Sequence, residues 1–220
     1  MNVSEAVDTR LSVRAFRPDP VDRAVLERVL VKAARAPSGG NLQPWIVTVL
    51  DGEKLEEFRA IMERRLAEGG TDEIEYEVYP QNLHSPYRDR RFKVGEDMYG
   101  LLGIARGDRD RRLEWFANNY RFFGAPAALF CHVDRKMGAP QWSDLGMFLQ
   151  TVMLLLREEG LDSCAQECWS RYPATVDAFV NPPENTMLFC GMAIGKRDPE
   201  APVNRLRADR APTEEWLRWL

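Results

Sequence analysis

The first residues that could carry chemistry are Arg10-Leu11-Ser12-Val13-Arg14, near the start of the chain. Two guanidinium groups flank a hydroxyl, beside the expected end of a helix. Arginine presents planar N–H donors that pair with phosphate or carboxylate oxygens, and serine adds a further donor. The cluster therefore indicates a site for a small anionic ligand. A solvated surface turn has the same residue types, and the spacing alone does not separate the two interpretations.

Residues 36–45 (APSGGNLQPW) form a second candidate site, between an expected helix and an expected strand. Two prolines and two glycines constrain the backbone to an unusual path, which can expose N–H and C=O groups to the edge of a flat heteroaromatic ring. Asn41 adds a side-chain donor and a side-chain acceptor. The alternative interpretation is a connector whose Trp45 fills the core.

Other kinds of chemistry find no support in the sequence. Cys164 and Cys168 have neither the spacing of a CxxC motif nor a nearby histidine, so we expect no metal site. The chain contains no Walker A loop and no GxGxxG, HExxH or GxSxG motif. His84 and His132 are far apart along the chain, and His132 falls within an expected strand. We expect structural roles for both histidines.

The elements that must position these clusters follow from apolar periodicity and breaker residues. They interleave without a regular β–α–β rhythm, which favours an α+β fold in a single domain over residues 1–220. Helices are expected after an Asp22 cap and near residues 55–66, 95–103, 111–122 and 144–159, and strands at 45–50, 127–133 and 186–194.

Three segments are expected to lie at a binding site or an interface. The helix over 144–159 is apolar around most of its circumference, which indicates burial at the domain centre or between subunits. Residues 68–91 are polar and show no period, and loops of this length are often lids. Residues 196–220 are expected to form a C-terminal arm. Its large apolar residues, among them Trp216 and Trp219, would be poorly placed in water and are expected to pack on another subunit.

The composition excludes several classes of protein. The 220 residues carry a net charge of −4, and this mild acidity argues against nucleic-acid binding, which usually requires a basic face. No apolar run is long enough to cross a bilayer. Residues 1–10 include Glu5 and Asp8 and contain no apolar block, so no signal peptide is expected. With four cysteines expected as reduced thiols, we predict a cytoplasmic protein with no membrane partner.

Taken together, the RxSxR and APSxxNxQPW patterns resemble the FMN-dependent nitroreductase family. The likeness extends from Val3 to about Trp216. The segment from Tyr87 to Gly95 and the FFGAP stretch most resemble the branch that reduces nitrobenzoates and similar nitroaromatics. The further motifs that carry the resemblance lie at residues 119–126 (NYRFFGAP), 142–150 (WSDLGMFLQ), 160–166 (GLDSCAQ), 191–195 (GMAIG) and 204–212 (NRLRADRAP).

The resemblance implies a nitroreductase-like fold, with a central mixed β-sheet flanked by helices. It also implies an intertwined homodimer with a C-terminal arm, in which FMN binds at the interface in two equivalent sites. NADH or NADPH would deliver hydride to flavin N5 and leave, and a nitroaromatic or quinone acceptor would then take its place in a ping-pong reaction. Because the flavin performs the difficult step, we name no catalytic residue.

The resemblance assigns the phosphate end of FMN to two segments of the chain. Arg10 and Ser12, with Leu11 between them, would bind the phosphate. Arg210 would close on the same phosphate from the C-terminal arm, and Arg207 would assist it.

The resemblance also assigns the flavin ring. Arg14 would reach N1 and O2, where a fixed positive charge stabilises the negative charge that reduction creates. Ala165 occupies a position where relatives often have proline, so the geometry near N5 is the least typical part of the site. The other residues that would line the ring are Pro37, Ser38 and Asn41 from the other subunit, and Cys164, Ala165 and Gln166 at the N5 and O4 edge.

Three residues are candidates for contact with the substrate. Arg88 and Arg91 could receive a substrate carboxylate or an NADPH phosphate, and Phe123 could stack on an aromatic ring. The alternatives are a solvated basic face for the arginines and a core position for the phenylalanine.

Three alternative functions share the fold, or the fold and the flavin, with the function that the resemblance implies. The same fold with FMN could serve reductive dehalogenation or flavin breakdown. The chain could bind flavin without useful turnover. It could also be a domain without flavin, which is hard to reconcile with the presence of Arg10, Ser12, Arg14 and Arg210.

Overall fold

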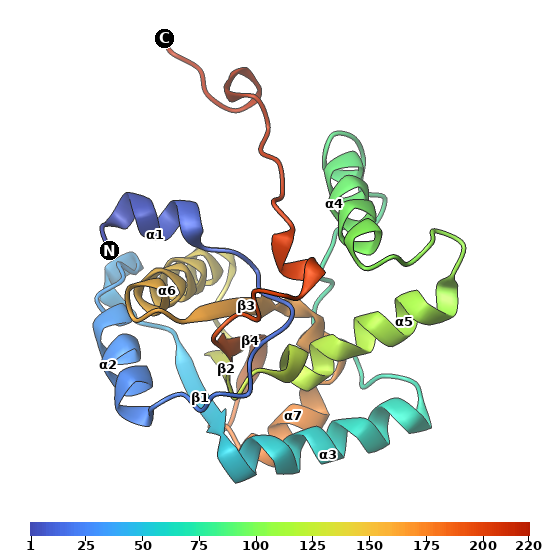
Figure 1. The fold of residues 1–220 in the computed structure, drawn as a ribbon. Helices are drawn as coiled ribbons and strands as arrows, with labels where there is room; N and C mark the ends of the chain where they lie inside the picture. Colours follow the sequence, from blue (N-terminus) through green and yellow to red (C-terminus); the bar gives the residue numbers. More distant parts are fainter.

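The core of the computed structural model, which describes residues 1–220, is a sheet of four strands: β1 (Ile46–Asp51), β2 (Ala127–Asp134), β3 (Asp162–Gln166) and β4 (Thr186–Gly195). Their order across the sheet is β1-β2-β4-β3 (Figure 1). All three strand pairs are antiparallel. The two edges of the sheet are therefore β1 and β3.

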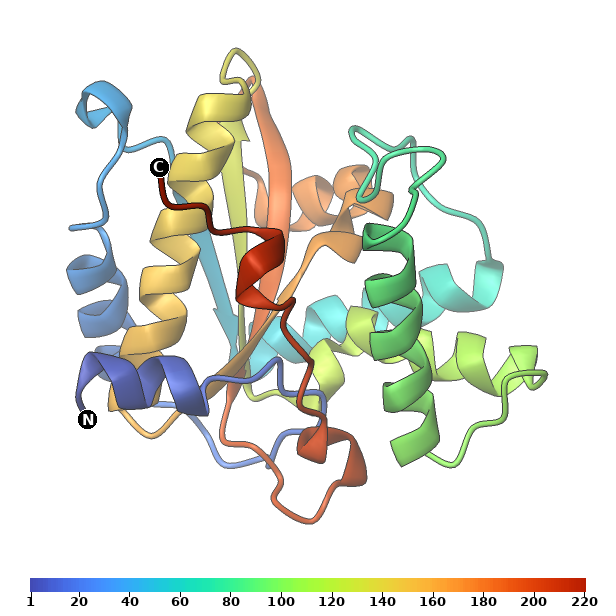
Figure 2. The same cartoon turned by 90° about the horizontal axis from the view of Figure 1, so that it is seen from above.

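Helices cover both faces of the sheet (Figures 1 and 2). Because side chains alternate along a strand, β2 contributes Leu129 to the core on one face and Phe130 to the core on the other. Phe148 packs in the first core and Phe58 in the second. The first side carries α1 (Val3–Thr9), α2 (Arg23–Ala33) and α6 (Ala139–Glu158), and the second carries α3 (Gly52–Glu68) and α7 (Pro173–Val180).

Two further helices, α4 (Tyr87–Leu101) and α5 (Arg109–Ala117), lie beside this core and bury none of their residues. α4 stands apart from the sheet in both views (Figures 1 and 2). None of the helices combines the length and the apolar run that a membrane crossing requires. Short 3₁₀ helices span Gly39–Asn41, Asn118–Gly124, Glu167–Arg171, Pro202–Arg205 and Thr213–Glu215.

The predicted α+β class is confirmed, and every predicted helix and strand is present. The strand ends agree within one residue, and the helix ends differ by up to eight. The Asp22 cap is also confirmed, since its carboxylate accepts from the N–H of Ala24 at 2.8 Å. The prediction of a mixed sheet is wrong. β2 and β3 do run parallel, joined by α6, but β4 lies between them and pairs antiparallel with both.

Two elements, β3 and α7, were not predicted, and of α1 only the end beside Arg10 was expected. The expected loop over 68–91 is also too long, because α4 already begins at Tyr87 and the irregular stretch covers residues 69–86. Exposed ion pairs along α4, such as Lys93 with Asp97 at 2.6 Å, favour the helix despite its lack of apolar period.

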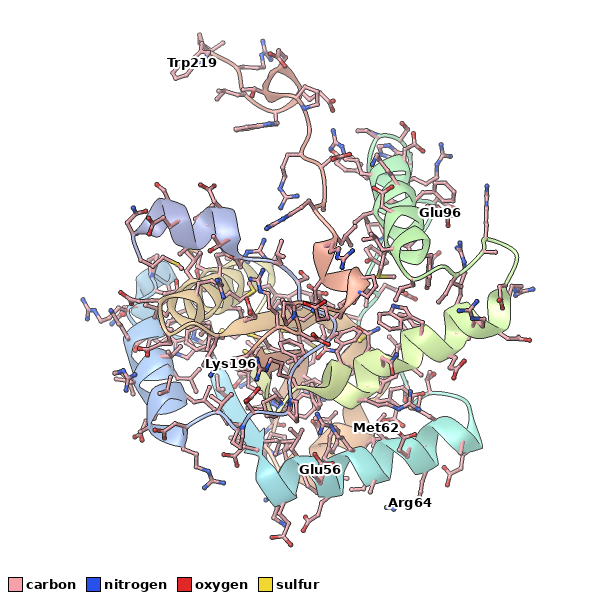
Figure 3. The ribbon with its side chains drawn as sticks, viewed as in Figure 1. Glu56, Met62, Arg64, Glu96, Lys196 and Trp219 are labelled. Atoms are coloured by element: carbon pink, nitrogen blue, oxygen red, sulfur yellow. The ribbon has the colours of Figure 1, made fainter.

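The C-terminal segment (residues 206–220) runs away from the body of the chain (Figures 1 and 3). Trp216 and Trp219 are 68% and 88% exposed. The whole chain of 25.3 kDa exposes 12963 Å² of surface, roughly a quarter more than the about 10,300 Å² expected of a compact monomer of this mass. The chain therefore presents apolar surface that it does not itself cover.

Candidate functional site

The N-terminal motif lies against strand β3. Ser12 forms a parallel bridge with Ser163, and the N–H of Val13 donates to the C=O of Ser163 at 3.0 Å. Residues 10–14 and the stretch Cys164–Gln166, which are remote in sequence, are thus neighbours in the fold. The sequence analysis assigned both stretches to one site, and the structure brings them together.

A buried ion-pair network holds the chain just before Arg10. Asp162, at the start of β3, is 3% exposed and pairs with Arg157 at 2.7 Å and Arg197 at 2.5 Å. Arg197 also donates to the C=O of Thr9 at 3.1 Å, and Arg157 donates to the Thr9 hydroxyl at 3.4 Å. The sequence analysis gave Asp162 no role, and its only signal was its place in the GLDSCAQ motif. The network ties α1 to α6, β3 and the end of β4.

Asn204 joins the N-terminal motif to the start of the C-terminal segment. Its side-chain oxygen accepts from the backbone N–H of Arg14 at 2.9 Å. Its amide nitrogen donates to the C=O groups of Ala15 at 2.8 Å and Asp198 at 2.9 Å. All three hydrogen bonds of this half-buried amide are to backbone groups. Asn204 therefore fixes the backbone of the motif and does not occupy the guanidinium group of Arg14.

Arg10 and Arg14 of the motif and Arg207, Arg210 and Arg218 of the C-terminal segment form no ion pair with a carboxylate. Arg210 donates only to backbone C=O groups adjacent to it, at 2.9 and 3.0 Å. Arg17, a few residues further on, is by contrast paired at 2.7 Å. Cations that no internal carboxylate neutralises, together with the Ser12 hydroxyl, fit a phosphate group such as that of FMN. The donor set of the chain therefore fits the cofactor implied by the resemblance.

The side chains of β3 point into the core, so this strand offers mainly backbone to a ligand. Burial raises the pKa of the Cys164 thiol to about 11, although Arg14 and Arg10 lower it, so the thiol is neutral near pH 7 and is no nucleophile. The Gln166 amide donates to the C=O of Asn119 at 2.6 Å. Only Ala165 of the three residues is partly exposed. This arrangement suits backbone contacts with the N5 and O4 edge of a flavin.

The loop over residues 37–41 has the unusual backbone that its prolines and glycines predict. Asn41 and Gln43 both have positive φ, at 58° and 50°. The Ser38 hydroxyl accepts from the N–H of Gln43 at 3.0 Å, and the N–H of Gly39 donates to the Asp144 carboxylate of α6 at 3.2 Å. The loop is thus anchored near the N-terminal end of α6.

This loop and the N-terminal motif lie far apart within one chain. The loop precedes β1, and β1 and β3 are opposite edges of the sheet, about 14 Å apart at the usual strand spacing. The loop contacts α6 at Asp144, whereas Thr9, the residue just before the motif, contacts α6 at Arg157, and these two positions are about 20 Å apart along the helix. The structure therefore does not bring Pro37, Ser38 and Asn41 onto β3 of the same chain.

Trp45 and the two histidines lie away from the candidate site residues on β3 and in the N-terminal motif. Trp45 stacks on Phe148 of α6 with ring centroids 4.8 Å apart, so it does fill the core. His132 is fully buried on β2, and its Nε2 lies 3.0 Å from a carboxylate oxygen of Asp177. His84 is exposed, and its Nδ1 contacts the backbone of the next residue. The structural roles expected for both histidines agree with these positions.

A cavity of about 670 Å³ opens beside Arg14. Phe123 forms part of its wall, is 7% exposed, and lies 6.3 Å from Trp115 between ring centroids. The cavity therefore joins a guanidinium to an aromatic wall. The residues that line it are Arg14, Ala15, Glu56, Arg59, Ala60, Glu63, Trp115, Asn118, Arg121, Phe123 and Gly124.

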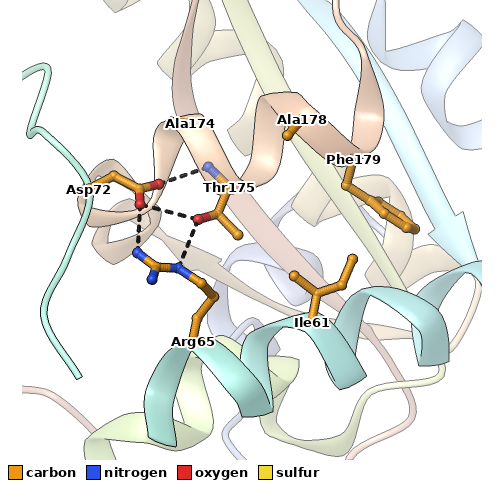
Figure 4. A pocket seen from close by; sticks show the side chains of 7 residues that line it. All are labelled: Ile61, Arg65, Asp72, Ala174, Thr175, Ala178 and Phe179. Carbon is orange, nitrogen blue, oxygen red and sulfur yellow. Dashed lines mark hydrogen bonds and ion pairs between the residues drawn. The ribbon is translucent and has the colours of Figure 1, made fainter. Parts of the chain in front are cut away.

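A second cavity, of about 430 Å³, lies between α3 and α7 (Figure 4). Its polar side chains are bonded to one another: Arg65 pairs with Asp72 at 3.0 Å, and Asp72 also accepts from the N–H of Thr175 at 2.7 Å. The remaining wall is apolar. The cavity offers no free polar group, and none of the predicted site residues lines it.

The two candidate substrate arginines lie on α4 and differ in their partners. Arg88 pairs with Asp89 at 2.9 Å, whereas Arg91 stacks over the ring of Tyr79 at 4.0 Å. Lys93 pairs with the C-terminal segment at 2.9 Å. Arg90, beside Arg91, also pairs with this segment, at Glu215. The structure leaves Arg91 as the candidate whose guanidinium has no carboxylate partner.

Comparison with known proteins gives consistent matches. The family model described as the nitroreductase family matches residues 7–196. The chain is 35% identical over 214 residues to a 4-nitrobenzoate reductase of Pseudomonas putida, which covers 97% of this chain and 93% of that protein. A crystal structure of the FMN- and NADPH-dependent nitroreductase NfnB from sphigopyxis sp. strain HMH has a TM-score of 0.96 and 50% identity, covering 100% and 99% of the two chains. The FMN-dependent NfnB from Mycobacterium smegmatis, in complex with NADPH, has a TM-score of 0.93 and 31% identity with full coverage of both chains.

Proposed function

Because the chain belongs to the nitroreductase family, we propose that it is an FMN-dependent oxidoreductase that uses NADH or NADPH to reduce nitroaromatic acceptors. Nitrobenzoates are the first candidates as acceptors and quinones the second. The names of the relatives support this choice, since one reduces 4-nitrobenzoate and another depends on FMN and NADPH. The structural observation that carries the proposal is the N-terminal motif beside β3, in which Arg10 and Arg14 have no carboxylate partner. A cytoplasmic location, where nicotinamide cofactors are available, is part of the proposal.

The phosphate end of the proposed FMN site uses residues of the N-terminal motif and of the C-terminal segment. Arg10 and Ser12 hold the phosphate, with Arg210 and Arg207 closing on it from the C-terminal segment. Arg14 lies at the pyrimidine end, where its free donors can meet N1 and O2. When bound, FMN accepts and donates hydride at N5 in a ping-pong sequence.

The proposed contact with the N5 and O4 edge uses backbone. Cys164 and Gln166 are buried and Ala165 is partly exposed, so the strand presents peptide groups there. In this proposal the protein binds, orients and shields the flavin ring. No side chain has to act as an acid, a base or a nucleophile.

We propose that two copies form an intertwined homodimer, and that Pro37, Ser38 and Asn41 of one copy complete the flavin site of the other. These residues lie at the sheet edge opposite to their own β3, so a second copy is needed to bring them to the ring. The large exposed surface supports an interface of substantial area. On α6, which packs against the sheet, Met147 is 39% exposed, and on α1 Val3 is 75% exposed.

The proposed acceptor site lies near the aromatic wall formed by Phe123. Arg91 is the better placed of the two α4 arginines to receive a carboxylate, since Arg88 already has one partner. The irregular residues 69–86, together with the start of α4, are proposed as the lid over this site. An expected consequence is that carboxylated nitroaromatics bind more tightly than nitrobenzene.

The reaction can be tested on the purified protein by absorbance. Flavin bands are expected in the spectrum, to bleach under anaerobic NADPH or NADH, and to recover after 4-nitrobenzoate is added. If the flavin bands recover after the nicotinamide nucleotide has been removed, reduction of the flavin and its reoxidation by the acceptor are established as two separate half-reactions. A colourless protein that also fails to take up added FMN would contradict the proposed function, and bleaching without recovery would leave a flavin protein of another activity.

Deleting Trp216–Leu220 is expected to loosen the dimer, because these exposed apolar side chains are proposed to pack on the partner. Light scattering over a dilution series measures the effect as a rise in the dimer dissociation constant. The matched control replaces Glu214, a polar residue of the same segment, with glutamine. A truncated protein that stays as fully dimeric as the control would remove the interface role of the segment.

A further inference from the structure

The turn at residues 122–124 has a backbone that its sequence does not favour. Phe122, Phe123 and Gly124 have φ of 52°, 53° and 77°. Glycine adopts this left-handed region freely, but two consecutive phenylalanines there are unusual, because their Cβ atoms crowd the backbone. Such residues persist only where the surrounding structure determines their conformation. Phe122 is fully buried, and Phe123 is nearly so.

Arg59 of α3 spans this turn. Its Nε donates to the C=O of Arg121, just before the turn, at 3.2 Å, and its Nη2 donates to the C=O of Ala125, just after it, at 2.5 Å. Its Nη1 pairs with Glu56 one turn earlier in α3. The planar guanidinium thus joins both ends of the turn, and its three nitrogens are all committed within the protein.

The turn also borders the cavity beside the proposed flavin site. Phe123 and Gly124 line the cavity beside Arg14. Three residues before the left-handed stretch, the C=O of Asn119 accepts from the Gln166 amide of β3. The turn therefore connects the Arg14 wall with the strand proposed to contact the flavin edge.

We propose that Arg59 is a positioning residue for the flavin and acceptor site, an inference that rests on the proposed function. It holds the turn in its left-handed form, and the turn sets the place of Phe123 against Arg14. Arg59 also lines the cavity, but both of its bonds to backbone go to the two ends of the turn, so its proposed action is through the turn. Relaxation of the turn to ordinary φ would move the Phe123 ring and the wall of the cavity together.

Arg59→Met tests this role, since it keeps much of the length and apolar stem and removes the bonds to both ends of the turn. Arg65→Met is the matched control: Arg65 lies on the same helix and also joins it to other segments, but at the cavity between α3 and α7 (Figure 4). The measurements are the visible circular dichroism of the bound flavin, kcat and KM for 4-nitrobenzoate, and the melting temperature of the holoenzyme.

The expected result is a lower melting temperature in both variants, with a changed flavin dichroism and a fall in kcat/KM of about tenfold only in Arg59→Met. Arg59→Lys, which can donate to one carbonyl at a time, is expected to recover part of kcat/KM and carries the test if the methionine variant does not fold. Unchanged dichroism and kcat/KM in the Arg59 variants would overturn the proposal. A wild-type protein that binds no flavin would instead overturn the proposed function, and this inference with it.

Discussion

Replacing Arg10 with alanine is expected to weaken FMN binding by about 1.5–3 kcal/mol, roughly a 10- to 150-fold rise in the dissociation constant. The Arg10 guanidinium has no carboxylate partner in the chain, so its proposed bonds to the phosphate have no internal substitute. Titration of flavin-free protein, followed by flavin fluorescence, gives the constant. Arg210→Ala is expected to have an effect of similar size, because Arg210 is proposed to close on the same phosphate.

The matched control for both is Arg17→Ala. It removes the same charge from the N-terminal part of the chain, but Arg17 is 54% exposed and already paired with Asp19. Such a surface pair contributes about 1 kcal/mol or less, and no phosphate contact is proposed for it. FMN affinity that stays at the wild-type value in Arg10→Ala and Arg210→Ala would mean that the phosphate binds elsewhere.

Replacing Asp162 with asparagine is expected to lower the free energy of unfolding by about 3–5 kcal/mol, because it leaves Arg157 and Arg197 without their shared, buried carboxylate. For a chain of this size the loss corresponds to a fall of about 6–20 °C in melting temperature. Urea and thermal unfolding with saturating FMN measure both values. Affinity for FMN is expected to fall as well, since Arg197 also holds the C=O of Thr9, next to Arg10.

Asp19→Asn is the control for this network. Its carboxylate pairs with Arg17 at 2.7 Å, the same distance as Asp162 with Arg157, but it is 39% exposed against 3%. We expect Asp19→Asn to change stability by about 1 kcal/mol or less, because solvent screens the pair. Equal losses for the two variants would show that burial of the Asp162 network contributes nothing to the fold.

The elements that were predicted from sequence are those whose signals are local. α2 has its Asp22 cap and apolar period, and the breaker residues after it end it. β3 was missed because it is short and contains no β-branched residue, and its partners, β4 and the bridge at Ser12, are remote in sequence. α1 did carry a local signal, the capping box of Asn2 and Glu5, which the sequence analysis did not use.

For the candidate site, the sequence indicated the residues that are proposed to face the ligand but not the residues that hold them in place. Arg10, Ser12 and Arg14 are recognisable because their types and spacing suit an anion. The roles of Asp162 and Arg59 depend on partners far along the chain, and a lone Asp or Arg gives no sign of its partner. The left-handed conformation of Phe122 even opposes the preference of its residue type, so only tertiary contacts could determine it.

The position of the 37–41 loop and β3 at opposite edges of the sheet has a consequence for how the protein behaves when dilute. In the proposed homodimer each cofactor site takes residues from both chains, so whatever stabilises the bound cofactor also stabilises the association, by mass action. Flavin occupancy then depends on protein concentration as well as on flavin concentration. When the dimer separates, both sites are lost at once. Each released chain keeps its phosphate motif but no longer has its partner's 37–41 loop to complete the ring pocket.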